Sequence, residues 1–183
     1  MPFTSNWLEE LVAEWLQLDG YCVEVGLPVS VMKVGGRFEA DVVGAKVLNN
    51  ELQIRHIECD QLPSGEQSIK SLQNKFSDRN RSSIEEYFKQ RFGIVGKVNY
   101  DKLYVASYWS RPVIEKAGKL GIIIITLPDF IVNEVLPTIH KWRDNAPQQP
   151  RTRGKHITLP QSCWFLQLID YLHNRGLLNQ SEI

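Results

Sequence analysis

The sequence predicts an α/β fold with a mixed sheet of about five strands, flanked by helices and followed by C-terminal helices. Strand-like segments joined by a hairpin-type turn occupy residues 21–59, which predicts antiparallel strands. A strand, a short helix and a continuous apolar strand follow at residues 102–127, which predicts a right-handed parallel crossover. The predicted order is helix, three strands, helix, strand, helix, strand.

Composition places the chain among ordinary globular proteins. It has 183 residues, of which 43% are hydrophobic and 23% are charged, and no stretch has the length and purity of a membrane span. The first residues lack the basic segment and apolar run of a secretory signal, so we expect a cytoplasmic protein with no membrane partner. Its three cysteines form no CxxC pair, which argues against a zinc knuckle. The net charge of +0 means that any nucleic-acid binding needs a local basic patch.

The first half of the chain predicts one helix and three strands. Apolar residues at helical spacing fill residues 7–19, and Gly20 follows the expected helix end. Residues 21–25 predict a strand that ends at Gly26 and Pro28. Residues 38–48 and 51–59 predict a hairpin, because the intervening Asn49-Asn50 pair tolerates the positive φ of a tight turn.

The second half alternates helices and strands. Residues 64–92 fit two helices or one kinked helix, and residues 102–108 predict a strand before a short helix at 111–119. The apolar run 121–127 is typical of a strand buried on both faces of a sheet. Residues 129–143 predict a further helix, which Pro137 would kink or end.

This pattern predicts one core domain with an appendage. We assign residues 1–143 to the core and 144–160 to a basic, proline-containing loop with the run Arg151-Thr-Arg-Gly-Lys-His. Residues 161–183 then carry a C-terminal helix packed on the core, with its amphipathic part at 164–175.

Two carboxylates stand out on the predicted hairpin. Asp41 lies in one strand, and Glu58 lies in the segment HIECDQ at the end of the next strand. A buried carboxylate is costly without a basic partner or a metal ion. The two acids therefore indicate a basic partner, a metal ion, or a strand end that is exposed to solvent. His56 shares a strand face with Glu58, where it would donate to a carboxylate or bind a soft metal, although a lone histidine on a strand is more often simply packed or exposed at the surface.

The element order and several short segments together resemble the PD-(D/E)XK nuclease superfamily, the restriction-endonuclease-like proteins, and within it the Mrr-like and Holliday-junction-resolvase-like groups. The resemblance covers roughly residues 6–130. It is carried by LEELVAEWL with GYCV, by FEADVV, by IECD, and by YVASYWS followed by GIIIIT.

This resemblance implies a metal-dependent endonuclease, a hydrolase that cleaves DNA phosphodiester bonds. Asp41 and Glu58 match the metal-binding acids of the family, and the backbone carbonyl of Cys59 would be a third ligand for Mg²⁺ or Mn²⁺. Glu9 is the best match to a helix-borne glutamate that completes such sites, with Glu10 and Glu14 as alternatives. The spacing from Asn6 to Glu9 is also that of a capping box, which needs no metal.

The chain departs from the family at one catalytic position. The family usually carries a lysine two residues after the glutamate, and this chain has Asp60 there. Asp60 would act as a third carboxylate, or the lysine has moved to the following helix as Lys70 or Lys75, or catalysis has been lost. We therefore take Asp41, Glu58, Asp60 and Lys70 as the candidate catalytic residues.

The expected partner is a nucleic acid, and DNA in particular. Basic residues follow the candidate site, but the acids among them favour a solvated, mixed-charge helix surface over a surface that binds phosphates. These basic residues are Lys70, Lys75, Arg79, Arg81, Lys89 and Arg91. Two other functions stay open: a catalytically inactive accessory protein of a recombination, mobile-element or restriction system, and a protein-interaction module, with a homodimer or a protein partner in either case.

Overall fold

A computed structural model describes residues 6–31, 37–94, 96–145 and 159–178. Its centre is one five-stranded sheet, and the strands lie in the sheet in the same order as in the chain. They are β1 (Cys22–Val31), β2 (Arg37–Leu48), β3 (Glu51–Leu62), β4 (Val98–Trp109) and β5 (Ile123–Thr126). The pairs β1/β2 and β2/β3 are antiparallel, and β3/β4 and β4/β5 are parallel. The predicted mixed sheet is confirmed.

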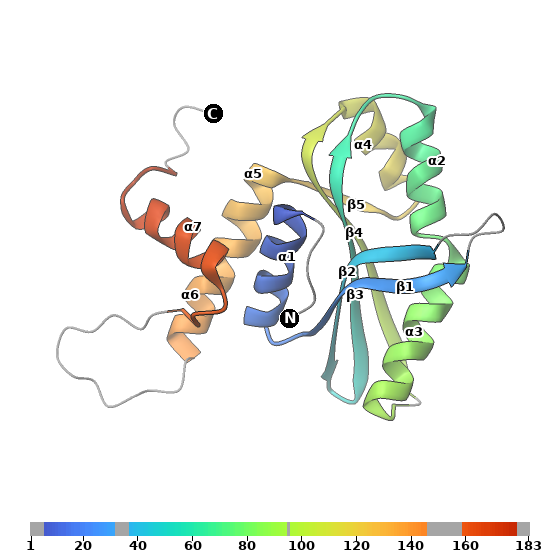
Figure 1. The fold of residues 1–183 in the computed structure, drawn as a ribbon, viewed down its shortest axis with the longest axis horizontal. Helices are drawn as coiled ribbons and strands as arrows, with labels where there is room; N and C mark the ends of the chain where they lie inside the picture. The colour runs from blue at the N-terminus through green and yellow to red at the C-terminus, as the bar shows by residue number, and fades with distance from the viewer. Residues whose placement is uncertain (1–5, 32–36, 95, 146–158, 179–183) are drawn as a thin grey trace.

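Helices cover both faces of this sheet (Figure 1). The helices are α1 (Trp7–Leu18), α2 (Glu66–Lys75), α3 (Asp78–Phe92), α4 (Arg111–Gly118), α5 (Leu127–Phe130), the π-helical η1 (Ile131–Val135), α6 (Leu136–Asn145) and α7 (Trp164–Asn174). One face carries α1 and the α5–α6 segment, and α2, α3 and α4 cover the other. The predicted order of helices and strands is confirmed, with two helices between β3 and β4. Within the described ranges, none of the helices combines the length and the apolar character needed to cross a bilayer.

The turn between β2 and β3 follows from its two asparagines. Asn49 and Asn50 have φ values of 52° and 63°, and Leu48 pairs with Glu51 across the turn. Positive φ at both central positions is the geometry of a type I′ hairpin, which asparagine tolerates. This confirms the predicted hairpin.

Strand β1 is longer than predicted. It continues through Gly26, whose φ is +62°, and through Pro28 to Val31, with a register shift between Pro28 and Ser30. In the described sheet β1 is an edge strand, where a proline without an N–H costs no ladder bond on its outer side. The strand therefore passes through both residues, with a change of register against β2, instead of ending at them.

Strand β5 is less buried than its composition predicts. Ile124 and Ile125 pack toward opposite faces, but Ile123 is 55% exposed. The cause is topological, since β5 is the other edge of the described sheet and has a strand neighbour only in β4. The prediction of a strand buried on both faces is thus wrong for Ile123.

The long helical segment after β5 contains Pro137, and its hydrogen-bond pattern changes from α-helical to π-helical just before this proline. Helix α5 passes into the π-helical η1, and α6 then begins at Leu136, just before Pro137. Proline cannot donate to a carbonyl one turn back, and a π-helical turn accommodates the missing bond. The helix therefore continues past Pro137 and extends to Asn145.

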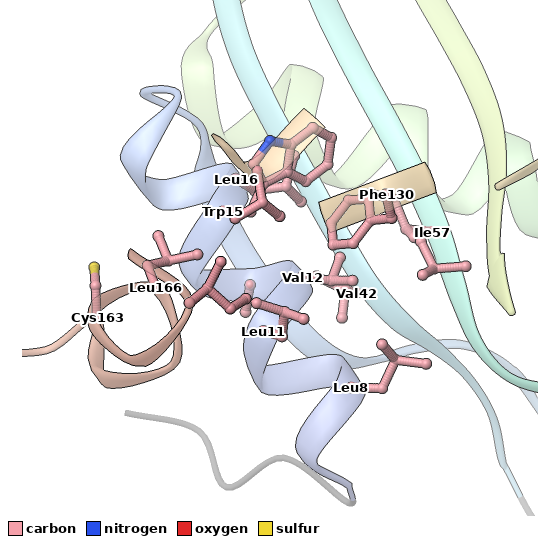
Figure 2. Close-up of a cluster of buried hydrophobic side chains, with 14 of the residues drawn as sticks. Leu8, Leu11, Val12, Trp15, Leu16, Val42, Ile57, Phe130, Cys163 and Leu166 are labelled. Atoms are coloured by element: carbon pink, nitrogen blue, oxygen red, sulfur yellow. The ribbon is translucent and has the colours of Figure 1, made fainter. Parts of the chain in front are cut away.

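Helix α1 is buried between the sheet and α7. Figure 2 shows Cys163 and Leu166 on one side of α1, and Val42, Ile57 and Phe130 on the other. Glu14 of α1, 4% exposed, accepts hydrogen bonds from the backbone N–H groups of Phe165 and Leu166 at 3.2 and 3.0 Å. Since the first N–H groups of a helix lack internal partners, Glu14 caps α7 from a distant part of the chain.

The contact between α1 and β2 depends on Gly44. A Cβ atom at this position would lie 2.9 Å from Cδ1 of Leu16 and 3.2 Å from two atoms of Tyr21. We expect Gly44→Ala to lower the free energy of unfolding by about 1–3 kcal/mol, as overpacking does in cores. Urea denaturation measures this, with Gly118→Ala as the control, because a Cβ at Gly118 meets nothing within 4 Å. Equal stability of the two variants would contradict the close approach of α1 to β2.

Candidate functional site

The two predicted acids lie where β2 and β3 separate. The last paired residues are Val42 and Ile57, and beyond them β2 stays with β1 while β3 stays with β4 (Figure 1). Asp41 and Glu58 are the next residues on each strand. Where the two strands no longer pair, the Asp41 side chain bridges them: its Oδ2 accepts a hydrogen bond from the backbone N–H of Cys59 at 2.9 Å. The hairpin therefore brings the two carboxylates together, and we call them the carboxylate pair.

Lys75 joins the carboxylate pair from the end of α2. Its Nζ lies 3.2 Å from Oδ2 of Asp41 and donates a short hydrogen bond to Oε2 of Glu58. The Glu58 side chain is 1% exposed, whereas those of Asp41 and Lys75 are 20% and 27% exposed. One ammonium group thus contacts both carboxylates at a site that opens to solvent on the side of Asp41 and Lys75.

The end of α2 is held in place by a buried asparagine. Asn80, in the first turn of α3, donates through Nδ2 to the carbonyls of Asn74 and Lys75, both at 3.0 Å. Phe76, the residue after Lys75, is buried, and the centre of its ring lies 4.7 Å from the centre of the His56 ring. These contacts fix the backbone from which the Lys75 side chain extends.

Charge and burial give the three groups different protonation behaviour. Burial, and then the charge of Glu58, raise the pKa of Asp41 to about 7. Burial alone would also raise the pKa of Glu58, but the hydrogen bond from His56 and the charge of Lys75 outweigh it and bring that pKa below its usual value. The pKa of Lys75 is raised despite burial, because Glu58 and Asp41 are so close. Asp41 therefore exchanges its proton near neutral pH while Glu58 is ionised and Lys75 is charged.

Two of the predicted catalytic residues are exposed, in contrast to the buried Glu58. Asp60 is exposed at a register shift of β3 against β4, and its Oδ1 accepts the N–H of Gln61 at 2.7 Å. Lys70 is exposed on α2, more than one helical turn before Lys75. Of the two lysines considered for the missing family lysine, the structure brings Lys75 to the carboxylate pair.

Cys59 follows Glu58 on β3, and Glu9 is in the first turn of α1, the helix that packs against the same core as Cys59. Glu9 is 4% exposed, and its Oε1 accepts from Nδ2 of Asn6 at 2.6 Å, while Oδ1 of Asn6 accepts from the N–H groups of Leu8 and Glu9. Burial, followed by the charges of Asp41, Glu58 and Glu9, raises the pKa of the Cys59 thiol. Asn6 thus caps α1, Glu9 is hydrogen-bonded to the side chain of this cap, and the charge of Glu9 contributes to the raised pKa of Cys59.

The donor atoms of the carboxylate pair suit a hard divalent cation. Across the described ranges, no set of three or more His, Cys, Asp or Glu side chains forms a ready-made metal centre. Mg²⁺ keeps several waters and is often held by only one or two carboxylates. The two acids of the carboxylate pair, which already share the ammonium of Lys75, are therefore enough to hold such an ion. Asp41 and Glu58 are the residues that would bind such an ion.

The basic residues of α3 are largely paired with acids. Arg81 and Lys89 both contact Glu85, at 2.6 and 3.9 Å, and Arg91 contacts Glu24 of β1. This matches the solvated, mixed-charge surface that the sequence left open. The run Arg151-Thr-Arg-Gly-Lys-His lies outside the described residues.

Comparisons with known proteins assign the chain to no family. No protein-family model matches the chain, and no curated protein matches it. Two solved chains are similar in structure. One is the crystal structure of a protein of unknown function, AF1548, with 17% identity and a TM-score of 0.43 over 92% of this chain and 77% of the other. At that TM-score the likeness carries no argument about fold or function.

The raised pKa of Asp41 predicts a pH-dependent contribution to stability. The folded protein keeps a proton on Asp41 up to about pH 7, whereas the unfolded chain releases it near 3.8. Folding is therefore disfavoured as pH rises through this window, by up to about 1.4 kcal/mol per pH unit. Asp41→Asn removes the effect, so we expect this variant to gain stability relative to wild type as pH rises from about 4 to about 7 in urea denaturation, with a constant difference at higher pH. A difference that does not change with pH would contradict the buried, proton-exchanging carboxyl.

The contact with Lys75 predicts a second titration effect. The charge of Lys75 lowers the pKa of Asp41, so Lys75→Gln is expected to raise that pKa above its wild-type value. Carbon-detected NMR of the Asp41 carboxyl measures it. Lys70→Gln, on the same helix but exposed, is the matched control and should leave the pKa unchanged.

Proposed function

We propose that this chain is a metal-dependent phosphodiesterase of the PD-(D/E)XK type, acting on DNA, in which Lys75 replaces the lysine absent at Asp60. The observation that carries the proposal is the contact of one ammonium, that of Lys75, with both carboxylates, at Asp41 Oδ2 and Glu58 Oε2. These are the acids that the family resemblance assigns to the metal. A lysine beside them is the third element that the sequence at position 60 lacks.

The chemistry of phosphodiester hydrolysis explains why these three groups belong together. A divalent cation bound by the carboxylate pair would supply an activated water and neutralise charge on the phosphate. Asp41 and Glu58 hold negative charge where a cation is needed, and Glu58 is kept ionised by His56 and Lys75. Lys75 carries a fixed positive charge at the solvent-accessible side, where it stabilises the negative charge that develops on the phosphate oxygens.

Asp41 gives the proposed site a further property. With a pKa raised to about 7, it holds a proton in a substantial fraction of molecules at neutral pH. Metal binding requires the ionised carboxylate, so it competes with this proton. Affinity for the cation should therefore increase as pH rises through about 7.

The first test measures metal binding and hydrolysis with the same variants. We expect calorimetry to detect Mn²⁺ binding to wild type and a large loss of binding in Asp41→Asn and Glu58→Gln. With supercoiled plasmid, linear duplex, branched and single-stranded DNA as substrates, hydrolysis by these variants should fall about 10²-fold or more. Asp60→Asn, an exposed acid on the same strand as Glu58, is the matched control and should behave as wild type.

Lys75 is expected to separate metal binding from catalysis. Lys75→Met removes the cation that now lies between the carboxylates, so Mn²⁺ should bind at least as tightly as to wild type. Hydrolysis should nevertheless fall about 10²-fold, because the charge that stabilises the phosphate is lost. Full activity in Lys75→Met, with Lys70→Met again as the control, would show that another group performs this role.

A further inference from the structure

The two oxygens of the Glu58 carboxylate have different partners. Oε2 contacts Lys75 at the open side of the site, and Oε1 lies 2.7 Å from Nε2 of His56. The side chains of Glu58 and His56 are each 1% exposed, so these contacts are made inside the protein. An ionised carboxylate only accepts hydrogen bonds, and Nε2 of His56 is therefore the donor to Oε1.

His56 is in turn oriented by Tyr100 of β4. The Tyr100 hydroxyl lies 2.9 Å from Nδ1 of His56, and burial raises the pKa of this phenol, which keeps its proton. A protonated phenol that donates to Nδ1 leaves the imidazole hydrogen on Nε2. The ring of Phe76 packs against His56, and the guanidinium of Arg81 lies 5.1 Å from the centre of the Tyr100 ring. The chain of donors then runs from Tyr100 through His56 to Glu58.

We propose that His56, oriented by Tyr100, is a positioning residue that holds Oε1 of Glu58 in the interior and leaves Oε2 alone to face Asp41 and Lys75. This inference rests on the proposed function, because it concerns how Glu58 meets a divalent cation. It extends that function to selectivity: a carboxylate with one oxygen held away offers a single donor atom to the site.

A single donor oxygen favours small octahedral cations over calcium. Ca²⁺ accepts both oxygens of a carboxylate and tolerates irregular coordination, whereas Mg²⁺ requires near-ideal octahedral geometry. By holding Oε1, His56 would keep Glu58 from chelating Ca²⁺ with both oxygens. Groups that orient a metal ligand in this way typically change metal affinity by about 10–100-fold when they are removed.

The test compares metal affinities in variants of the full chain. Calorimetry with Mn²⁺ and with Ca²⁺ is carried out on wild type, His56→Leu, His56→Gln and Tyr100→Phe. We expect the ratio of Mn²⁺ to Ca²⁺ affinity to fall about tenfold or more in His56→Leu. It should be largely restored in His56→Gln, whose amide can still donate to Oε1, and should fall less in Tyr100→Phe. His140→Leu, at an exposed histidine of α6, is the matched control.

A second measurement on the metal-free protein follows the donor chain directly. Nitrogen-15 NMR of His56 should show hydrogen on Nε2 and none on Nδ1 in wild type, and Tyr100→Phe should weaken this preference. The opposite tautomer would overturn the inference, and so would His56→Leu that folds and binds both metals as wild type does. If wild type binds no Mn²⁺, the proposed function fails and the inference fails with it, which is a different result from an unchanged ratio.

Discussion

The buried negative charge of Glu58 is the constraint around which this site is organised. At 1% exposure the carboxylate has almost no water to solvate it, so its charge must be balanced by protein groups. The structure supplies His56 from its own strand and Lys75 from α2, and Tyr100 of β4 holds His56. Removal of any one of these groups leaves a buried polar or charged group without its partner. This explains why β3, α2 and β4 meet at Glu58.

The same constraint connects the site to the packing of α2 and α3. Lys75 reaches Glu58 only because the end of α2 lies above the strand face that carries His56 and Glu58. Asn80 fixes that end through the carbonyls of Asn74 and Lys75, and Phe76 fills the space beside the imidazole. A lysine in the last turn of a helix also interacts favourably with the helix dipole. Helix packing and charge neutralisation therefore favour the same arrangement.

Local patterns predicted most elements, and the failures occurred where distant contacts decide. The Asn49-Asn50 turn, α1 and the acids on adjacent strands follow from spacing and residue type within a few positions. The behaviour of β1 at Gly26 and the exposure of Ile123 depend instead on which strands are edges. Sequence reasoning named Lys75 only beside Lys70, because its contact with Glu58 spans 17 residues and that with Asp41 spans 34. Which of the two lysines reaches the carboxylate pair depends on where α2 ends, and Asn80 of α3 fixes that end. No local sequence pattern predicts this contact.

The position of a charge in space matters more to the proposed chemistry than its position in the sequence. In a strand, residues two apart lie on the same face, so the usual family lysine would share the face of Glu58. Here β3 shifts register after Asp60, and that side chain is exposed. Helix α2 covers this face, and a lysine at its end reaches the same space from above. In the proposed function, an ammonium supplied by α2 would therefore act on a phosphate beside the carboxylate pair, while position 60 carries an acid.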